Sequence, residues 1–273
     1  MKKILFVCTD HHFPNGAFDF LISLHQTEKV AVTGLFFSPM EYGPVATASQ
    51  IPIDSPYRQL KEKDRKVVED NKALFVRQCS LNNIPYQIHA NEEQWEKDTL
   101  GKESRFSDLV LLSGELFYPE MSTGQPNSFL HEALQVSESP VLIIPEHFAP
   151  LQRLVFAYDG GKESLHAMKQ FCYLFPQYTD LPTEIVFVKD DDKEEIPDLD
   201  NLRGYGRLHF NSMGFSKLHF KHADAFAGWI EEKQQVLMVS GSFGRSSFSY
   251  LTRHSFAGKL IHNHKVPVFI AHS

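Results

Sequence analysis

The sequence contains an internal repeat, and this repeat constrains the fold more than any other feature of the chain. Three segments of the first half recur in the same order in the second half: 3–7 with 153–157, 110–114 with 237–241, and 139–143 with 266–270. The first copy is longer, and its extra residues fall around 38–60. Such a repeat predicts two domains of one design, which we place at residues 1–148 and 151–273.

Each copy alternates short apolar runs with longer amphipathic stretches. The apolar runs lie at 3–8, 30–37, 86–89, 109–113 and 140–144 in the first copy, and at 153–158, 184–188, 217–220, 235–239 and 267–271 in the second. Several runs are continuous, as expected for strands that helices cover on both faces. The predicted fold class is therefore α/β, with a doubly wound parallel sheet in each copy. Such sheets bind ligands at the carboxyl ends of their strands.

A long helix is predicted before the third strand of the first copy. Apolar residues recur every seven positions at Leu60, Val67, Leu74 and Leu81, with Val68 and Phe75 beside two of them. This spacing predicts a single apolar stripe along the helix. The insert that precedes it, 39–58, is rich in proline, serine and aromatic residues. We interpret the insert either as an ordinary loop or as a lid or partner surface.

Composition argues against several classes of protein. No apolar run reaches the roughly 20 residues needed to span a bilayer, and the N-terminus is typical of a buried strand and not of a signal peptide. The net charge of −7 argues against nucleic acid and anionic membranes as partners. Cys8, Cys79 and Cys172 lie far apart, as expected in a reducing compartment. We therefore expect a cytoplasmic protein.

A loop rich in glycine and serine follows the fourth strand of the second copy. Its residues are Ser240, Gly241, Ser242, Phe243, Gly244, Arg245, Ser246 and Ser247. Glycine lets a backbone approach a phosphate group closely, while hydroxyls, a helix N-terminus and an arginine add donors and positive charge. The same composition is typical of a plain strand-to-helix turn. The loop alone leaves both interpretations open.

Charge distinguishes the two copies around this loop. Residues 240–273 contain no acidic side chain, and their basic ones are Arg245, Arg253, Lys259 and Lys265. The corresponding residues 113–146 contain no lysine or arginine, and their acids are Glu115, Glu120, Glu132, Glu138 and Glu146. Phe117 also takes the place of Gly244. We expect an anion site in the second copy and none in the first.

These residues resemble those of a tandem universal stress protein, in which two domains of that family are fused. The family's signature after the fourth strand is Gly, two residues, Gly, nine residues, then Gly followed by Ser or Thr. Gly241 and Gly244 match its first two positions, and Ser255 matches its hydroxyl. The resemblance implies five-stranded, Rossmann-like domains of the adenine-nucleotide alpha hydrolase-like class. It also implies an internal pseudo-dimer of the two copies through their last strands, with a homodimer as a further option.

The resemblance further implies a site for ATP or a related adenine nucleotide in the second copy, with Mg²⁺ as a candidate companion. Asp159 would lie near the ribose and base, and Val188 would border the adenine. The phosphates would meet Ser240, Gly241, Gly244, Arg245, Ser246, Ser247, His254 and Ser255. His254 replaces the family's third glycine, so its imidazole either fills the phosphate space or donates to a phosphate oxygen. In the first copy, Asp10 is expected to be a structural remnant.

Other clusters of polar residues predict no further site. The histidines at 11–12 and 262–264 and the acidic run at 189–195 lack the ligand spacing of zinc or EF-hand calcium sites, and we interpret them as solvated surface. The sequence has no GxSxG elbow and no Walker A loop, so we predict no catalytic residue and no metal site. Three functions follow, in order of preference: a nucleotide-binding stress-response protein, a scaffold of the same fold without nucleotide, and a slow nucleotide hydrolase.

Overall fold

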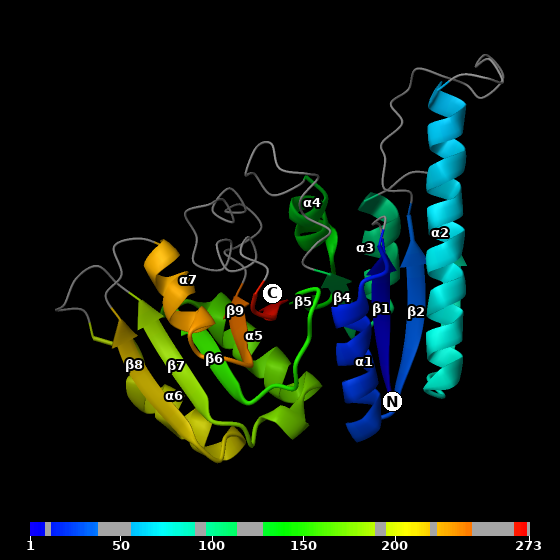
Figure 1. The fold of residues 1–273 in the computed structure, drawn as a ribbon. Helices are drawn as coiled ribbons and strands as arrows, with labels where there is room; N and C mark the ends of the chain where they lie inside the picture. The colour runs from blue at the N-terminus through cyan, green and yellow to red at the C-terminus, as the bar shows by residue number, and fades with distance from the viewer. Residues whose placement is uncertain are drawn as a thin grey trace.

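A computed structural model of the chain forms one ten-stranded sheet with helices on both faces (Figure 1). It describes residues 1–8, 12–37, 56–90, 97–113, 128–188, 195–218, 223–241 and 265–271. The strand order is β3-β2-β1-β4-β5-β10-β9-β6-β7-β8, so each half of the chain builds one half of the sheet. This arrangement confirms the predicted α/β class with doubly wound, mostly parallel strands.

The described elements of the two halves follow the same order, except that α4 has no described counterpart between β9 and β10, where residues 242–264 lie outside the described part of the chain. The first half consists of β1 (Lys2–Cys8), α1 (Asn15–Thr27), β2 (Val30–Phe36), α2 (Pro56–Leu81), β3 (Tyr86–Ala90), α3 (Lys97–Arg105), β4 (Leu109–Ser113), α4 (Ser128–Val136) and β5 (Val141–Ile144). The second half consists of β6 (Arg153–Tyr158), α5 (Lys162–Leu174), the 3-10 turn η2 (Pro176–Tyr178), β7 (Thr183–Val188), α6 (Leu199–His209), β8 (Met213–Leu218), α7 (Ala223–Glu231), β9 (Val236–Gly241) and β10 (Val268–Ala271).

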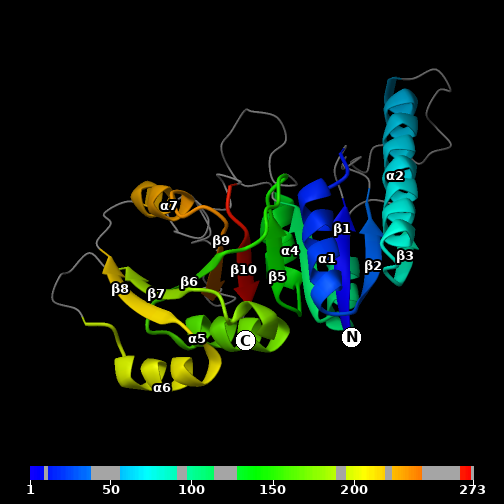
Figure 2. The same ribbon diagram turned by 60° about the horizontal axis from the view of Figure 1, so that its bottom comes forward.

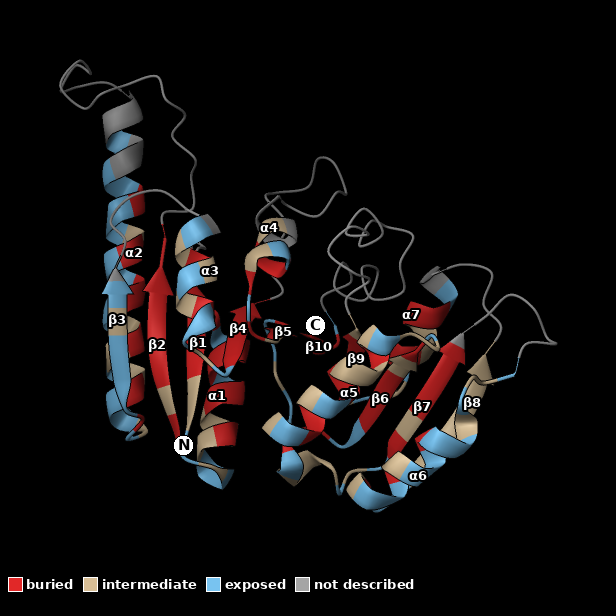
Figure 3. Cartoon of the chain, turned by 180° about the vertical axis from the view of Figure 1, so that it is seen from behind, coloured by how far each residue is buried: buried red, intermediate tan, exposed pale blue. Residues whose placement is uncertain are grey.

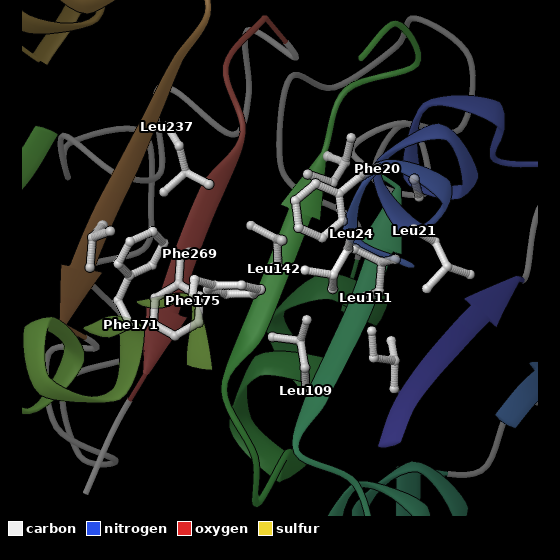
Figure 4. Packing of buried hydrophobic residues seen from close by; sticks show 14 of the residues in the cluster. Phe20, Leu21, Leu24, Leu109, Leu111, Leu142, Phe171, Phe175, Leu237 and Phe269 are labelled. Atoms are coloured by element: carbon white, nitrogen blue, oxygen red, sulfur yellow. The ribbon is translucent and has the colours of Figure 1, made fainter. Parts of the chain in front are cut away.

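The strands are parallel within each half and antiparallel where the halves meet. β5 and β10 pair in opposite directions, with Leu142 opposite Phe269. Aromatic side chains continue the core across this join: the rings of Phe20 and Phe175 lie 6.1 Å apart, and those of Phe175 and Phe269 lie 6.0 Å apart (Figure 4). One apolar layer therefore runs beneath both halves of the sheet.

The continuous apolar runs are explained by burial on both faces of the sheet (Figures 2 and 3). In β1, Ile4 and Phe6 point into the layer that contains α1, α2, α5 and α6. The alternate residues Leu5 and Val7 point into the opposite layer, with α3, α4 and α7. A strand with apolar neighbours on both sides has no position left for polar alternation. Among the described residues, no helix has the length and apolar character needed to cross a membrane.

The eighth strand lies earlier in the chain than predicted. The sequence predicted it at 217–220, whereas β8 occupies Met213–Leu218. β8 is the edge strand of the second half: Met213 and Phe215 pack against the core on one face and Leu218 on the other, but none of its residues is fully buried. An edge strand whose residues all stay partly exposed has a weak apolar signal, and this is why the sequence placed the strand too late in the chain.

The helix α2 was predicted correctly, and its buried stripe in part, since Val68 and Phe75 are buried as expected. The side chains that face the core are Val68, Phe75 and Cys79, whereas Leu74 is only partly buried and Leu81 is 66% exposed. A strict seven-residue spacing drifts around an α-helix by about 20° per heptad, so such a series leaves the buried face along a long helix. Of the 39–58 insert, residues 56–58 begin α2, and 39–55 lie outside the described residues.

Candidate functional site

The predicted nucleotide residues divide into a described group and an undescribed one. Asp159, Ser240 and Gly241 are described, as is the backbone of Val188. Six others lie outside the described residues, and their predicted roles stay predictions: Gly244, Arg245, Ser246, Ser247, His254 and Ser255. Asp10, in the first half, lies outside them as well. The structure therefore bears on the base side of the predicted site and on the start of its phosphate side, at Ser240 and Gly241.

The carboxyl edge of the second half brings three of these residues to one place. Tyr158 of β6 pairs with Phe187 of β7. The residues that follow them are Asp159 and Val188, so these two lie at neighbouring strand ends. On the other side of β6, Ala157 pairs with Ser240, which places Gly241 at the same level. Parallel neighbouring strands that end together form the crevice in which doubly wound sheets bind ligands.

Asp159 is held in place by the first turn of α5. Its Oδ1 atom accepts a hydrogen bond from the Gly161 N–H at 2.8 Å and another from the Ser164 hydroxyl, also at 2.8 Å. A carboxylate at a helix N-terminus is stabilised by the positive end of the helix dipole. Within the described part of the chain, Oδ2 makes no hydrogen bond, so this oxygen remains able to accept one from a ligand.

Gly241 places the end of β9 directly against the same helical turn. A Cβ atom at this position would lie 2.4 Å from the carbonyl carbon of Glu163 and 2.6 Å from the backbone nitrogen of Ser164. Only glycine allows two backbones to approach so closely. Ser240 is buried, and its hydroxyl donates to the Gly241 carbonyl at 3.1 Å. Asp159 and Gly241 thus meet at the N-terminus of α5.

The sequence did not identify the residues that pack around the turn between β6 and α5. Gly160 has a φ of +85° and packs against Pro197, where an added Cβ would lie 2.9 Å from Cγ of the proline. Tyr158 is buried, and among the described residues its hydroxyl has no hydrogen-bond partner. Burial raises the pKa of this hydroxyl, and the nearby carboxylates of Asp198 and Asp159 raise it further. Nothing in the order of residues links 197–198 to 158–160, because the contact depends on how α6 packs on the sheet.

Comparisons with known proteins agree with this fold. A universal stress protein from Synechocystis sp. is 24% identical over 167 residues, which cover 59% of this chain and 56% of that protein. The chain therefore matches little more than half the length of this relative. The crystal structure of a universal stress protein from Archaeoglobus fulgidus superposes with a TM-score of 0.69 at 14% identity, covering 99% of this chain and 96% of that chain. The chain is a universal stress protein homologue.

A second solved structure has the same fold over the same length. A protein of unknown function from Pseudomonas aeruginosa superposes on this chain with a TM-score of 0.55 at 9% identity, covering 100% of this chain and 92% of that chain. No family model matches the sequence. At these identities the structural likeness shows the fold, and any ligand of this chain has to be argued from the chain's own residues.

A metal site or a reactive cysteine would be a further kind of functional site in the described residues of this chain. No group of three or more histidine, cysteine or acidic residues there could hold a metal ion. The three cysteines are buried, and none of them forms a disulfide. Burial raises the pKa of Cys79 to about 12 and that of Cys172 to about 11, so both stay protonated and unreactive near neutral pH.

The first half differs from the second at the corresponding strand end. β1 ends at Cys8, and the side chain of Asn71 in α2 donates to its sulfur at 3.5 Å. β4 ends at Ser113, which is buried. By the repeat, Cys8 takes the position of Tyr158, and Asp10, the acidic residue that follows β1, lies outside the described residues.

Proposed function

We propose that this universal stress protein homologue binds an adenine nucleotide in its second half, in a domain of residues 151–273, and acts as a stress-response protein. The observation that most supports the proposal is that Asp159 and Gly241 meet at the first turn of α5, at the carboxyl edge where β7 also ends at Val188. Oδ2 of Asp159 accepts a hydrogen bond from a ribose hydroxyl, and Val188 borders the base.

The phosphates would extend from Gly241 toward residues 244–255. The basic residues that follow β9 favour such an anion, since residues 240–273 contain no acidic side chain. Mg²⁺ would accompany ATP through its phosphate oxygens, which are the ligands that this ion prefers.

A thermal-shift titration of the full chain with ATP and Mg²⁺ tests the proposal. A ligand at 100 times its Kd stabilises a protein by about 2.7 kcal/mol, which raises the Tm of a chain of this size by several degrees. Gly244→Glu places a carboxylate where the phosphates are expected, and we predict that it removes the shift. Phe117→Glu makes the same change at the corresponding position of the first half and should keep the shift.

Two results would contradict nucleotide binding in the second half. One is the absence of any shift at millimolar ATP, and the other is an equal shift in both variants. The first result would favour a scaffold of the same fold, for which the imidazole of His254 at the family's third glycine is the supporting observation.

A further inference from the structure

The described sheet has two open edges. In the two halves, the last strands β5 and β10 pair with each other, so neither of them is available to another chain. β3 and β8 are the terminal strands of the ten-stranded sheet. In Figure 3, β3 forms the lateral edge of the first half and is exposed along most of its length. An exposed edge presents unpaired backbone groups to any strand that fits beside it.

The hydrogen bonds to β2 show which backbone groups of β3 are open. The Val32 N–H donates to the Pro85 carbonyl at 2.9 Å. Because backbone groups alternate in direction along a strand, those of Gln87 and His89 also point toward β2. The N–H and C=O groups of the remaining residues point outward: Tyr86, Ile88 and Ala90.

The side chains of β3 favour pairing more than those of the other edge. Ile88 packs against the core, and the ring of Tyr86 lies 5.9 Å from that of Phe75 although the residue is 39% exposed. β3 contains no lysine, arginine or proline, the residues that usually protect an edge. β8 differs, because it contains Lys217 and because Arg203 covers the ring of Phe215 at 5.8 Å.

We propose that β3 pairs antiparallel with β3 of a second copy of this chain, about a two-fold axis at Ile88. In this register Ile88 faces the partner's Ile88, and Tyr86 faces the partner's Ala90. All three of these residues have outward backbone groups, so every facing pair exchanges both of its N–H···O=C bonds. The contact is the same for both copies, and therefore it closes as a dimer.

The helix above the edge leaves room for this partner. α2 contacts both β2 and β3, and so it lies over the two strands together. The partner's α2 would lie about two strand spacings away, roughly 10 Å. This separation is within the range of packed helices, at about 8–10 Å between axes. The two helices would run antiparallel on the same face of a continuous twenty-stranded sheet, formed from two sheets of ten strands.

Sedimentation of the full chain and of an edge variant tests the pairing. Ile88→Pro removes an outward N–H while leaving the N–H groups of Gln87 and His89 bonded to β2, a position where edge strands tolerate proline. We expect a concentration-dependent dimer in the wild type and at least a tenfold weaker one in Ile88→Pro. Ile88→Thr, which shortens the side chain but keeps the N–H, should dimerise more strongly than Ile88→Pro. Lys217→Pro makes the matched change at an outward position of β8 and should leave the dimer unchanged.

Hydrogen exchange of the wild-type chain gives a second readout that needs no variant. The peptide that spans Tyr86–Ala90 should lose protection when the protein is diluted below the dimer's Kd. A monomer at all concentrations would overturn the proposal, and so would exchange at β3 that does not depend on concentration. Loss of the dimer in Lys217→Pro would also overturn it, because that result would place the contact at β8.

Discussion

At Gly241 the end of β9 touches the first turn of α5, and the contact leaves no space for a side chain. A methyl group there would meet backbone atoms of Glu163 and Ser164 at 2.4–2.6 Å. Backbone cannot move aside as a flexible side chain can, so we expect Gly241→Ala to lower the free energy of unfolding by about 1–3 kcal/mol. Urea unfolding followed by circular dichroism measures this loss.

Gly228 provides the matched control for this substitution. It lies within α7, and a Cβ at that position would meet no atom within 4 Å. Alanine is a better helix former than glycine by up to about 1 kcal/mol, so Gly228→Ala should be neutral or stabilising. Equal losses in the two variants would show that Gly241 does not depend on a close backbone contact.

At the same scale, the sequence predicted some residues of the site and could not predict others. The sequence pointed to Asp159 and Gly241 because each lies at a strand end in a pattern of residue types, and the structure brings both to the first turn of α5. Tyr158 and Pro197 were not found, because a buried phenol and a proline have no such pattern and their roles come from packing between β6 and the start of α6. Sequence order can show where a strand ends but not which distant segment packs against that end.

Among the elements, α2 shows why a correctly predicted helix can have a buried face that was predicted only in part. Phe75 is fully buried, and its ring lies 5.5 Å from that of Phe6 and 5.5 Å from that of Phe36. Leu81, which the seven-residue spacing placed on the same stripe, is mostly exposed. A heptad pattern identifies a helix because apolar residues recur, but only the 3.6-residue turn decides which of them reach the core.

A pair of alanine substitutions in α2 measures this difference. Phe75→Ala removes a buried aromatic side chain and should cost about 3–5 kcal/mol of unfolding free energy. Leu81→Ala removes an exposed side chain and should change it by no more than about 0.5 kcal/mol. Denaturant melts of the two variants give both values. A loss in Leu81→Ala comparable to that in Phe75→Ala would mean that Leu81 is also buried in the folded protein.

At the scale of the whole molecule, the repeat predicted the sheet well because a duplicated strand pattern carries its strand order with it. The order 3-2-1-4-5 of the first half recurs in the second as 8-7-6-9-10. The open edges and their directions were beyond the sequence, because which backbone groups of β3 point outward depends on its register with β2. The phosphate side of the candidate site, at residues 244–255, remains a prediction from sequence.

The continuous core beneath the join predicts how the chain unfolds. Phe20 of α1 and Phe269 of β10 both pack near Phe175, so apolar side chains from each half are buried by the other. Loss of one half would expose these rings and the paired edges of β5 and β10 together. We therefore expect one cooperative transition for the full chain, although it has two repeats.

Trp95→Phe leaves Trp229 as a fluorescent probe of the second half, and Trp229→Phe leaves Trp95 as a probe of the first. Each variant should give a urea midpoint by fluorescence that coincides with its midpoint by far-ultraviolet circular dichroism. A fluorescence midpoint that departs from the circular dichroism midpoint of the same variant would mean that the halves unfold separately, and that the aromatic contacts across the join contribute little to stability.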